Sequence, residues 1–384
     1  MPGGFRIGRI FGIPIDLHPT WFVVFLLVTF GLAGNLNVEH PEWSATLRVV
    51  GAAATSLLFF ASILLHELGH SVVALRHRVP VLSITLFIFG GVAMLEREPD
   101  SARAELQIAI AGPIVSALLA LLFGGLAAIA PDDSLPASTL GWLSLINAGV
   151  AVFNLLPGFP LDGGRILRAF LWWRSGDLDR ATRFAANVGQ WIAYAFIAWG
   201  ALRAVGGDVG GLWTAFIGWF LLSAARATVR QATVDTSLRG LRARDLMSPD
   251  VARIPASASV GRFARDLVMR GRRWALVERD GAPVGLISLT DVRRLTPEEW
   301  DGTVVGQVAT PMAKVLTATL DSPARELLRA MATRQVNQIP IEENGKILGA
   351  VTREALVQAI EMPAASRDAG PAGAPQATAA ITRS

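Results

Sequence analysis

Two histidines four residues apart, with a glutamate between them, are the residues of this chain whose types and spacing most directly suggest chemistry. His66, Glu67 and His70 lie in the stretch ILLHELGH. Residues four apart share one face of a helix, so His66 and His70 can hold one zinc ion through their ring nitrogens, and Glu67 can reach a water molecule on that ion. The chain has no cysteine, so any metal must have nitrogen and oxygen ligands. The pattern predicts a zinc site.

A catalytic zinc ion normally has three protein ligands and one open position, so a third ligand must come from elsewhere. His77 is a candidate, but it lies in an arginine-flanked loop seven residues after His70. Asp162 is the better candidate because it follows a largely uncharged segment and sits in the turn PGFPLDGGR, whose prolines and glycines can bend its carboxylate back toward the histidines.

The segment that carries the histidines is apolar enough to lie in a membrane. The 384 residues are 52% hydrophobic and only 17% charged, which is more apolar than a soluble core requires. A span needs roughly 20 mainly apolar residues. Six segments qualify or come close: 17–37, 49–73, 106–130, 140–156, 184–202 and 212–225. The first resembles a signal peptide, but its uncharged stretch is longer than a secretory core, so we expect a retained helix.

Arginines gather in alternate connections between these spans, beginning with Arg6 and Arg9 before the first. By the positive-inside rule, both termini of this multi-pass protein face the cytoplasm, and the histidines and the turn at 157–165 lie toward that side. The chain has 35 Lys and Arg against 31 Asp and Glu, an excess too small to indicate a nucleic-acid partner. The charges therefore indicate orientation in a lipid bilayer.

The last third of the chain reads as soluble α/β structure and repeats itself. LMSP at 246–249 recurs as VATP at 308–311, and WALVERDGAPVGLIS at 274–288 recurs as QIPIEENGKILGAVT at 338–352. Two copies of about 60 residues suit a pair of small domains packed face to face. We expect a transmembrane domain at 1–230, a linker at 231–244, repeats at 245–300 and 301–362, and a disordered tail at 363–384.

The two motifs in this order resemble those of the site-2 proteases, intramembrane zinc metalloproteases, and in particular the bacterial and archaeal branch with six spans and a C-terminal pair of CBS (cystathionine β-synthase-like) domains. HELGH matches the first motif and NLLPGFPLDGGR, at 154–165, matches the second. The resemblance implies one zinc ion per chain held by His66, His70 and Asp162, Glu67 as general base, and Asn154 as the group that stabilises the oxyanion.

The resemblance also sets the expected fold and the expected location. The fold is an α-helical polytopic membrane domain with six transmembrane helices and a small membrane-associated β-hairpin, followed by a cytoplasmic α/β CBS pair, in the plasma membrane of a prokaryote. One position departs from the family, which often has an asparagine shortly after the Gly-Pro of its third span. Here AGPIVS ends in Ser116, and no catalytic role is assigned to it.

The segment VLSITLFIFGGVAMLE, at 81–96, reads as two short strands around Gly90 and Gly91 and resembles the family's membrane-associated hairpin. An exposed strand edge there could pair with an unwound transmembrane substrate by strand addition, so Gly90 and Gly91 are predicted substrate-binding residues. The alternative is that the two glycines only form a tight turn.

The paired repeats resemble CBS domains, which often bind adenine nucleotides. Asp291 in SLTD occupies the position of the ribose-binding aspartate, whereas the second copy, TREA, has Ala355 there. We therefore expect at most one nucleotide site with this feature. A purely structural role, or the formation of a homodimer through the CBS pair, is the alternative.

The resemblance implies hydrolysis of peptide bonds in or near transmembrane segments of membrane proteins, as in regulated intramembrane proteolysis. One alternative is a CBS-regulated transporter or channel in which HELGH is structural, but that would need polar residues along several spans, and here the ionisable groups gather at one depth. The other is an inactive relative that binds membrane partners, although every catalytic position is intact.

Overall fold

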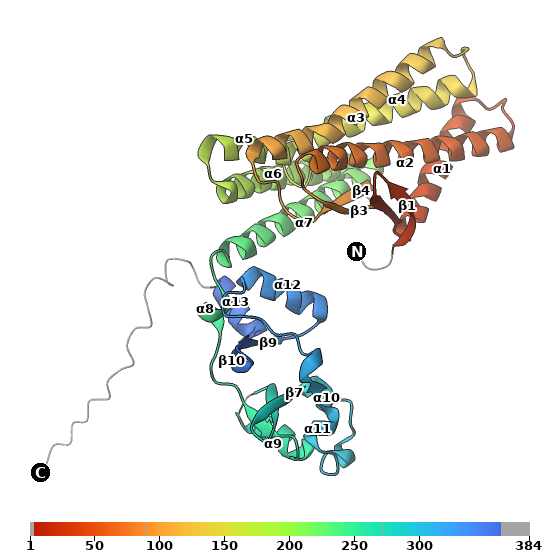
Figure 1. Ribbon diagram of the computed structural model, residues 1–384. Coiled ribbons are helices and arrows are strands. Elements are labelled where there is room, and N and C mark those ends of the chain that lie inside the picture. Colours follow the sequence, from red (N-terminus) through yellow and green to blue (C-terminus); the bar gives the residue numbers. More distant parts are fainter. Residues whose placement is uncertain (1–3, 89, 271, 362–384) are drawn as a thin grey trace, which may run out of the picture. The chain divides into compact units, whose positions relative to one another are not determined.

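The computed structural model describes residues 4–88, 90–270 and 272–361, which form two compact units divided between Ala232 and Thr233 (Figure 1). The first unit is mainly helical, and the second combines short helices with two small sheets. The predicted disordered tail at 363–384 lies outside the described residues.

Within the described residues, five helices of the first unit are long and apolar enough to cross a membrane: α1 (Thr20–Glu39), α2 (Ala45–Arg76), α3 (Ala102–Ile129), α4 (Leu135–Asn154) and α7 (Gly210–Ser237). The sixth predicted span lies inside α6 (Leu178–Val205), which is long enough but less apolar, because Asn187 and Gln190 lower its mean hydropathy. Its role as a span therefore stays a prediction.

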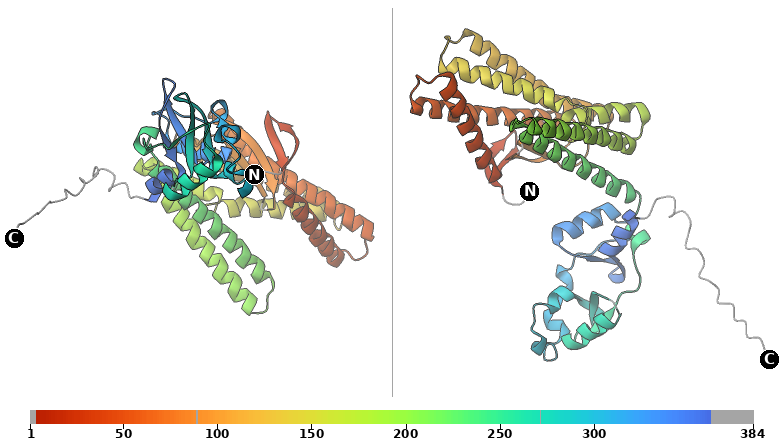
Figure 2. Two further views of the ribbon diagram at one scale, coloured as in Figure 1. Left: turned by 90° about the horizontal axis from the view of Figure 1, so that it is seen from below. Right: turned by 180° about the vertical axis from the view of Figure 1, so that it is seen from behind.

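The helices of this unit pack closely where small residues meet. Helices α3 and α4 run side by side, and so do α6 and α7 (Figures 1 and 2). A Cβ atom on Gly200 of α6 would lie 2.3 Å from the backbone nitrogen of Ala215 on α7, so only glycine permits this approach. Close backbone contact of this kind is typical of helices that associate in lipid, where packing replaces the hydrophobic effect.

A four-stranded sheet lies against α2. It consists of β1 (Phe5–Ile10), β2 (Ile13–Leu17), β3 (Val81–Phe87) and β4 (Gly90–Leu95) in the order β1-β2-β3-β4, with β2 and β3 parallel and the other pairs antiparallel. The predicted hairpin at 81–96 is thus β3 and β4, while β1 and β2 were not predicted. The buried side chains of Ile15 and Ile84 pack on Leu68, which fixes the sheet beside the histidine-bearing turns of α2.

The second unit contains two copies of a hairpin and its flanking helices. In the first copy, β6 (Trp274–Arg279) and β7 (Ala282–Ser288) pair between β5 (Arg253–Pro255) and β8 (Thr310–Pro311); in the second, β9 (Gln338–Glu343) pairs with β10 (Lys346–Thr352). The turns are Asp280–Gly281 and Asn344–Gly345, all with positive φ, as type I′ hairpins require.

The helices of this unit complete two separate cores, one in each copy. They are α8 (Ala243–Leu246), α9 (Val260–Arg270), α10 (Leu289–Val292), α11 (Val305–Val308), α12 (Ala324–Arg334) and α13 (Arg353–Glu361). The predicted linker at 231–244 is helical as far as Ser237, where α7 ends, and Leu238 is buried in the core of the second copy.

Candidate metal centre

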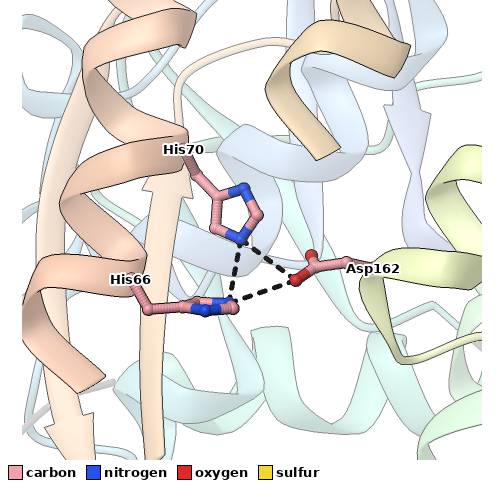
Figure 3. A group of neighbouring side chains, drawn as sticks. All are labelled: His66, His70 and Asp162. Carbon is pink, nitrogen blue, oxygen red and sulfur yellow. Dashed lines mark hydrogen bonds and ion pairs between the residues drawn. The ribbon is translucent and has the colours of Figure 1, made fainter. Parts of the chain in front are cut away.

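Three predicted ligand side chains meet in the interior of the first unit. His66 and His70 project from one face of α2 toward Asp162, the first residue of α5 (Asp162–Ser175) (Figure 3). The two Nε2 atoms lie 3.2 Å apart, and each lies 3.1 Å from Oδ2 of Asp162. Both histidines are 5% exposed and Asp162 is 9% exposed. This is the group of metal-ligating atoms that the sequence predicted to converge.

The triangle formed by these three atoms fits a zinc ion. With ligand bonds of 2.0 to 2.1 Å, the ligand atoms of a tetrahedral zinc ion are about 3.3 Å apart. The observed sides of 3.1 to 3.2 Å are close to one face of such a tetrahedron, which leaves the fourth corner for water or substrate. A cation would also satisfy two imidazole nitrogens that otherwise face one another.

Helix α3 orients both imidazole rings through groups that the sequence did not single out. Nδ1 of His70 donates a hydrogen bond to the carbonyl oxygen of Ile108 (2.7 Å), which leaves the Nε2 lone pair free for a metal. Nδ1 of His66 lies 2.9 Å from Oγ of Ser116. Such partners fix the ring orientation and the tautomer of a metal-binding histidine. Ser116 therefore holds the imidazole of His66, a predicted ligand, in place, although no role for Ser116 was predicted.

Gly112 of α3 makes room for the centre. A Cβ atom at this position would lie 2.2 Å from Nε2 of His70 and 2.6 Å from Nε2 of His66, inside the space that a metal ion would need. Any residue other than glycine would place a methyl group there. Gly112 is the glycine of the segment AGP, but nothing in the sequence indicated that its face of the helix meets the histidines.

The turn before α5 presents Asp162. Its carboxylate stands at the N-terminus of the helix, where the helix dipole favours a negative charge. Burial alone would raise the pKa of the Asp162 carboxyl, but the hydrogen bonds and charges of His66 and His70 outweigh it and hold this pKa below its usual value. The group is therefore an ionised carboxylate, the form that binds metal. His77 was the alternative ligand. Its Nε2 instead lies 2.6 Å from Oε1 of Gln107.

Glu67 lies one residue after His66 and therefore projects from a different side of α2, toward strand β4. A Cβ atom on Gly91 would lie 2.5 Å from Cγ of Glu67, so the strand passes directly over this side chain. The backbone of Ala93, on the same strand, also interacts with the carboxylate. Gly90 pairs with Phe87 in the sheet and has a positive φ of 119°. Both glycines lie inside β4, not in the turn before it.

Asn154 is the last residue of α4 and is half-buried. Its Nδ2 donates a hydrogen bond to the carbonyl oxygen of Val150 in its own helix (3.1 Å). The structure therefore does not join its amide to the three predicted ligand residues, in contrast to Ser116 and Ile108, which contact the histidines.

Residues 54–132 and 124–197 match peptidase family M50, and residues 243–298 and 305–362 each match the CBS domain. Over 363 residues the chain is 37% identical to "Putative zinc metalloprotease Rip3" of Mycobacterium tuberculosis, covering 93% of this chain and 92% of that protein. The chain belongs to peptidase family M50, the site-2 proteases. It is accordingly an intramembrane metalloprotease that carries a C-terminal CBS pair.

Other members of the family are similar over nearly the whole chain. A protein of Synechocystis sp. named as a putative zinc metalloprotease is 32% identical over 375 residues, which cover 95% of this chain and 97% of that protein. Among solved structures, the site-2 protease from Methanocaldococcus jannaschii is 33% identical, with a TM-score of 0.43, and covers 59% of this chain and 95% of that one.

The CBS pair of this chain forms a cleft of about 1220 Å³. Asp291 lines it, together with Ser248, Trp274 and Thr310. Oδ2 of Asp291 caps α10 by accepting hydrogen bonds from the backbone nitrogen (2.9 Å) and Oγ (2.8 Å) of Ser288. Basic side chains also line the cleft: Arg272, Arg273, Arg293, Arg294, Lys314 and Arg334.

Proposed function

We propose that His66, His70 and Asp162 hold one catalytic zinc ion and that Glu67 is the general base for hydrolysis of a peptide bond in a transmembrane segment. The observation that carries the proposal is the triangle of two Nε2 atoms and one Oδ2 atom with sides of 3.1 to 3.2 Å. A zinc ion bound there would lower the pKa of its water and polarise the scissile carbonyl.

The protein groups then handle the protons and the charge. Glu67 would accept the proton of the attacking water and pass it to the leaving amine. Gly91 and the backbone of Ala93 keep the Glu67 side chain in place for this transfer. Asn154 would stabilise the oxyanion, for which its amide must leave the carbonyl of Val150.

Substrate would bind along β4, the strand that covers the general base. Among the described residues, β4 pairs only with β3, so no strand occupies its second edge. An unwound stretch of substrate could add to this edge through main-chain hydrogen bonds, with Gly90 and Gly91 nearest to the reacting groups. This would hold the substrate in the extended form that hydrolysis needs.

Comparison of cells that carry the wild type or the Glu67→Gln variant tests the assignment. We expect single-pass membrane proteins to accumulate uncleaved in membrane fractions of the variant, because glutamine cannot accept a proton. Zinc analysis of both purified proteins should give one ion per chain, since Glu67 is not a ligand. A wild-type protein without zinc would support the alternative of a transporter or channel. Unchanged cleavage by Glu67→Gln would contradict the role of Glu67 as general base.

We also propose that both termini face the cytoplasm, that the protein lies in the plasma membrane of a prokaryote, and that the transmembrane domain ends near residue 230. The arginine-rich alternate connections support this orientation. Because the chain has no cysteine, single cysteines can be introduced without altering the background. A membrane-impermeant thiol reagent should label Gly207→Cys in whole cells and leave Gly240→Cys unlabelled; the reverse pattern would overturn the orientation.

The CBS pair would bind one adenine nucleotide and control the protease, or join two chains as a homodimer. The basic side chains around the cleft favour a phosphate-bearing ligand, and Asp291 lines the cleft as a ribose partner would. Titration calorimetry of the full-length protein with ATP and with AMP should show binding that Asp291→Ala weakens, and no heat with either would remove the nucleotide proposal. Light scattering of the same samples tests the dimer.

A further inference from the structure

A buried ion cluster joins the helix that carries Asp162 to the helix that orients the two histidines. Glu105, in the first turn of α3, is 1% exposed. Its Oε1 accepts hydrogen bonds from Nε of Arg165 (3.1 Å) and Nη2 of Arg168 (2.7 Å), both on α5. One carboxylate oxygen thus holds two guanidinium groups of another helix.

The spacing of these residues relates the cluster to the metal centre. Arg165 lies three residues after Asp162, on the same side of the first turn of α5. Glu105 lies three residues before Ile108, whose carbonyl oxygen accepts the hydrogen bond from His70. The contact between Glu105 and the two arginines is therefore one helical turn away from the point where each helix meets the centre.

A third chain segment also reaches the cluster. Arg168 donates through Nη1 to Oε1 of Glu98 (3.1 Å), in the connection between β4 and α3, and its guanidinium lies 5.4 Å from the ring centroid of Phe159, in the turn before α5. Two arginines face two glutamates, so the cluster is balanced in charge. It links α5 and its leading turn to α3 and to the segment that follows the strand over Glu67.

We propose that Glu105 is a positioning residue that, through Arg165 and Arg168, sets the register of α5 against α3 so that Asp162 reaches the histidine pair. This inference rests on the proposed metal centre. Among the described residues, the hydrogen bonds of the Glu105 side chain are to Arg165 and Arg168 and not to a predicted metal ligand, so Glu105 acts through α5.

The hydrogen bonds of the cluster indicate that it positions α5 against α3 more than it stabilises the fold. Oε2 of Glu105 and Nε of Arg168 have no hydrogen-bond partner among the described residues, so the cluster leaves buried polar atoms unsatisfied. Buried ion pairs are weak contributors to net stability because desolvation offsets their attraction, whereas their geometry can select one arrangement of the elements that they join. A site with three ligands requires that α5 keep one position against α3, so that Asp162 reaches the histidines.

Metal binding by the full-length, detergent-purified protein tests this role apart from activity. Glu105→Gln keeps the shape of the side chain but removes the charge that holds both arginines. We expect its zinc affinity, measured by competition with a chelator, to fall about 10- to 100-fold, as for partners that orient metal ligands. We also expect its cobalt-substituted form to lose the intense visible absorption of four-coordinate cobalt, because Asp162 no longer completes the site.

Two further variants guard against a misfolded product. Arg165→Lys keeps the charge but lacks the Nε–H that reaches Glu105, and it should lower zinc affinity about 10-fold even if Glu105→Gln does not fold. Asp208→Asn removes the exposed pair of Asp208 with Arg203 and should leave affinity and cobalt spectrum unchanged. Wild-type affinity and spectrum in Glu105→Gln or in folded Arg165→Lys would overturn the proposal. A wild type that binds no zinc would instead contradict the metal centre itself.

Discussion

At the residue scale, the candidate metal centre depends on the absence of a side chain at two glycines as much as on the predicted ligands. Gly112 on α3 lies against the two histidine rings, and Gly91 on β4 lies against Glu67. The two glycines therefore lie beside two different functional groups, so each group can be perturbed by its own substitution. The first would make room for the proposed metal ion, and the second for the proposed general base.

Gly112→Ala should abolish zinc binding in an otherwise folded protein. The added methyl group would lie 2.2 Å from Nε2 of His70, where it excludes a metal ion. We expect no stoichiometric zinc by elemental analysis and a loss of cleavage of at least about 100-fold. Gly125→Ala is the matched control on the same helix, because nothing lies within 4 Å of a Cβ atom there. Stoichiometric zinc in Gly112→Ala would contradict the site.

Gly91→Ala should leave zinc in place and slow the chemical step. Its methyl group would lie 2.5 Å from Cγ of Glu67 and displace the carboxylate, and a displacement of about 1 Å can cost about 100-fold in rate. The measurement is kcat on a purified substrate alongside zinc content, with Gly8→Ala in β1 of the same sheet as control, since a Cβ atom there meets nothing. Loss of zinc in Gly91→Ala would show that the two glycines are not separable.

At the element scale, the sequence predicts the helices better than the sheet. Long apolar runs mark α1 to α4 and α7, since lipid requires them. The strands β1 and β2 escaped prediction because they are short and because β2 pairs in parallel with β3, with Ile15 opposite Ile84. Such pairing joins residues far apart in the chain and leaves no local pattern.

The site shows the same division between local and non-local information. The spacing of His66 and His70 on one helix is local, and the turn around Asp162 has its own composition, so these ligands could be read from the chain. The hydrogen bond between Nδ1 of His66 and Oγ of Ser116 and the space at Gly112 depend on the rotation of α3 about its axis. That rotation is set by packing, which a single sequence does not display.

Val92→Pro should impair substrate binding without affecting the metal. Val92 lies in β4 opposite Thr85 of β3, and proline there removes a strand N–H and disturbs the strand that the substrate would extend. We expect a raised KM for a transmembrane substrate and unchanged zinc content, because all three ligands come from helices. Val92→Thr, which keeps the N–H and the branched side chain, serves as the control. An unchanged KM in Val92→Pro would argue against strand addition.

At the scale of the whole molecule, the chain consists of two units with separate cores. The centre lies wholly in the first unit, while the cleft that contains Asp291 lies wholly in the second. Ligands of the two sites should therefore act on different folding transitions. This separation allows each site to be studied in the full-length protein.

Removal of zinc should destabilise only the first unit. Binding to the folded state stabilises by about 2.7 kcal/mol at 100 times Kd, so a chelator should lower the temperature of one unfolding transition and leave the other in place. Calorimetry of the full-length protein with and without chelator checks this, and Asp162→Asn should show little further change on chelation. A chelator shift in both transitions would mean that the units do not unfold independently.

The open edge of β4 has a consequence for which proteins are attacked. Main-chain hydrogen bonds are common to every amino acid except proline, so the proposed recognition along this edge would place little demand on the identity of the substrate's side chains. Susceptibility would then follow from how readily a transmembrane helix frays. Helix-weakening residues such as glycine or asparagine within a span would mark a protein for cutting, and a robust leucine-rich span would protect it.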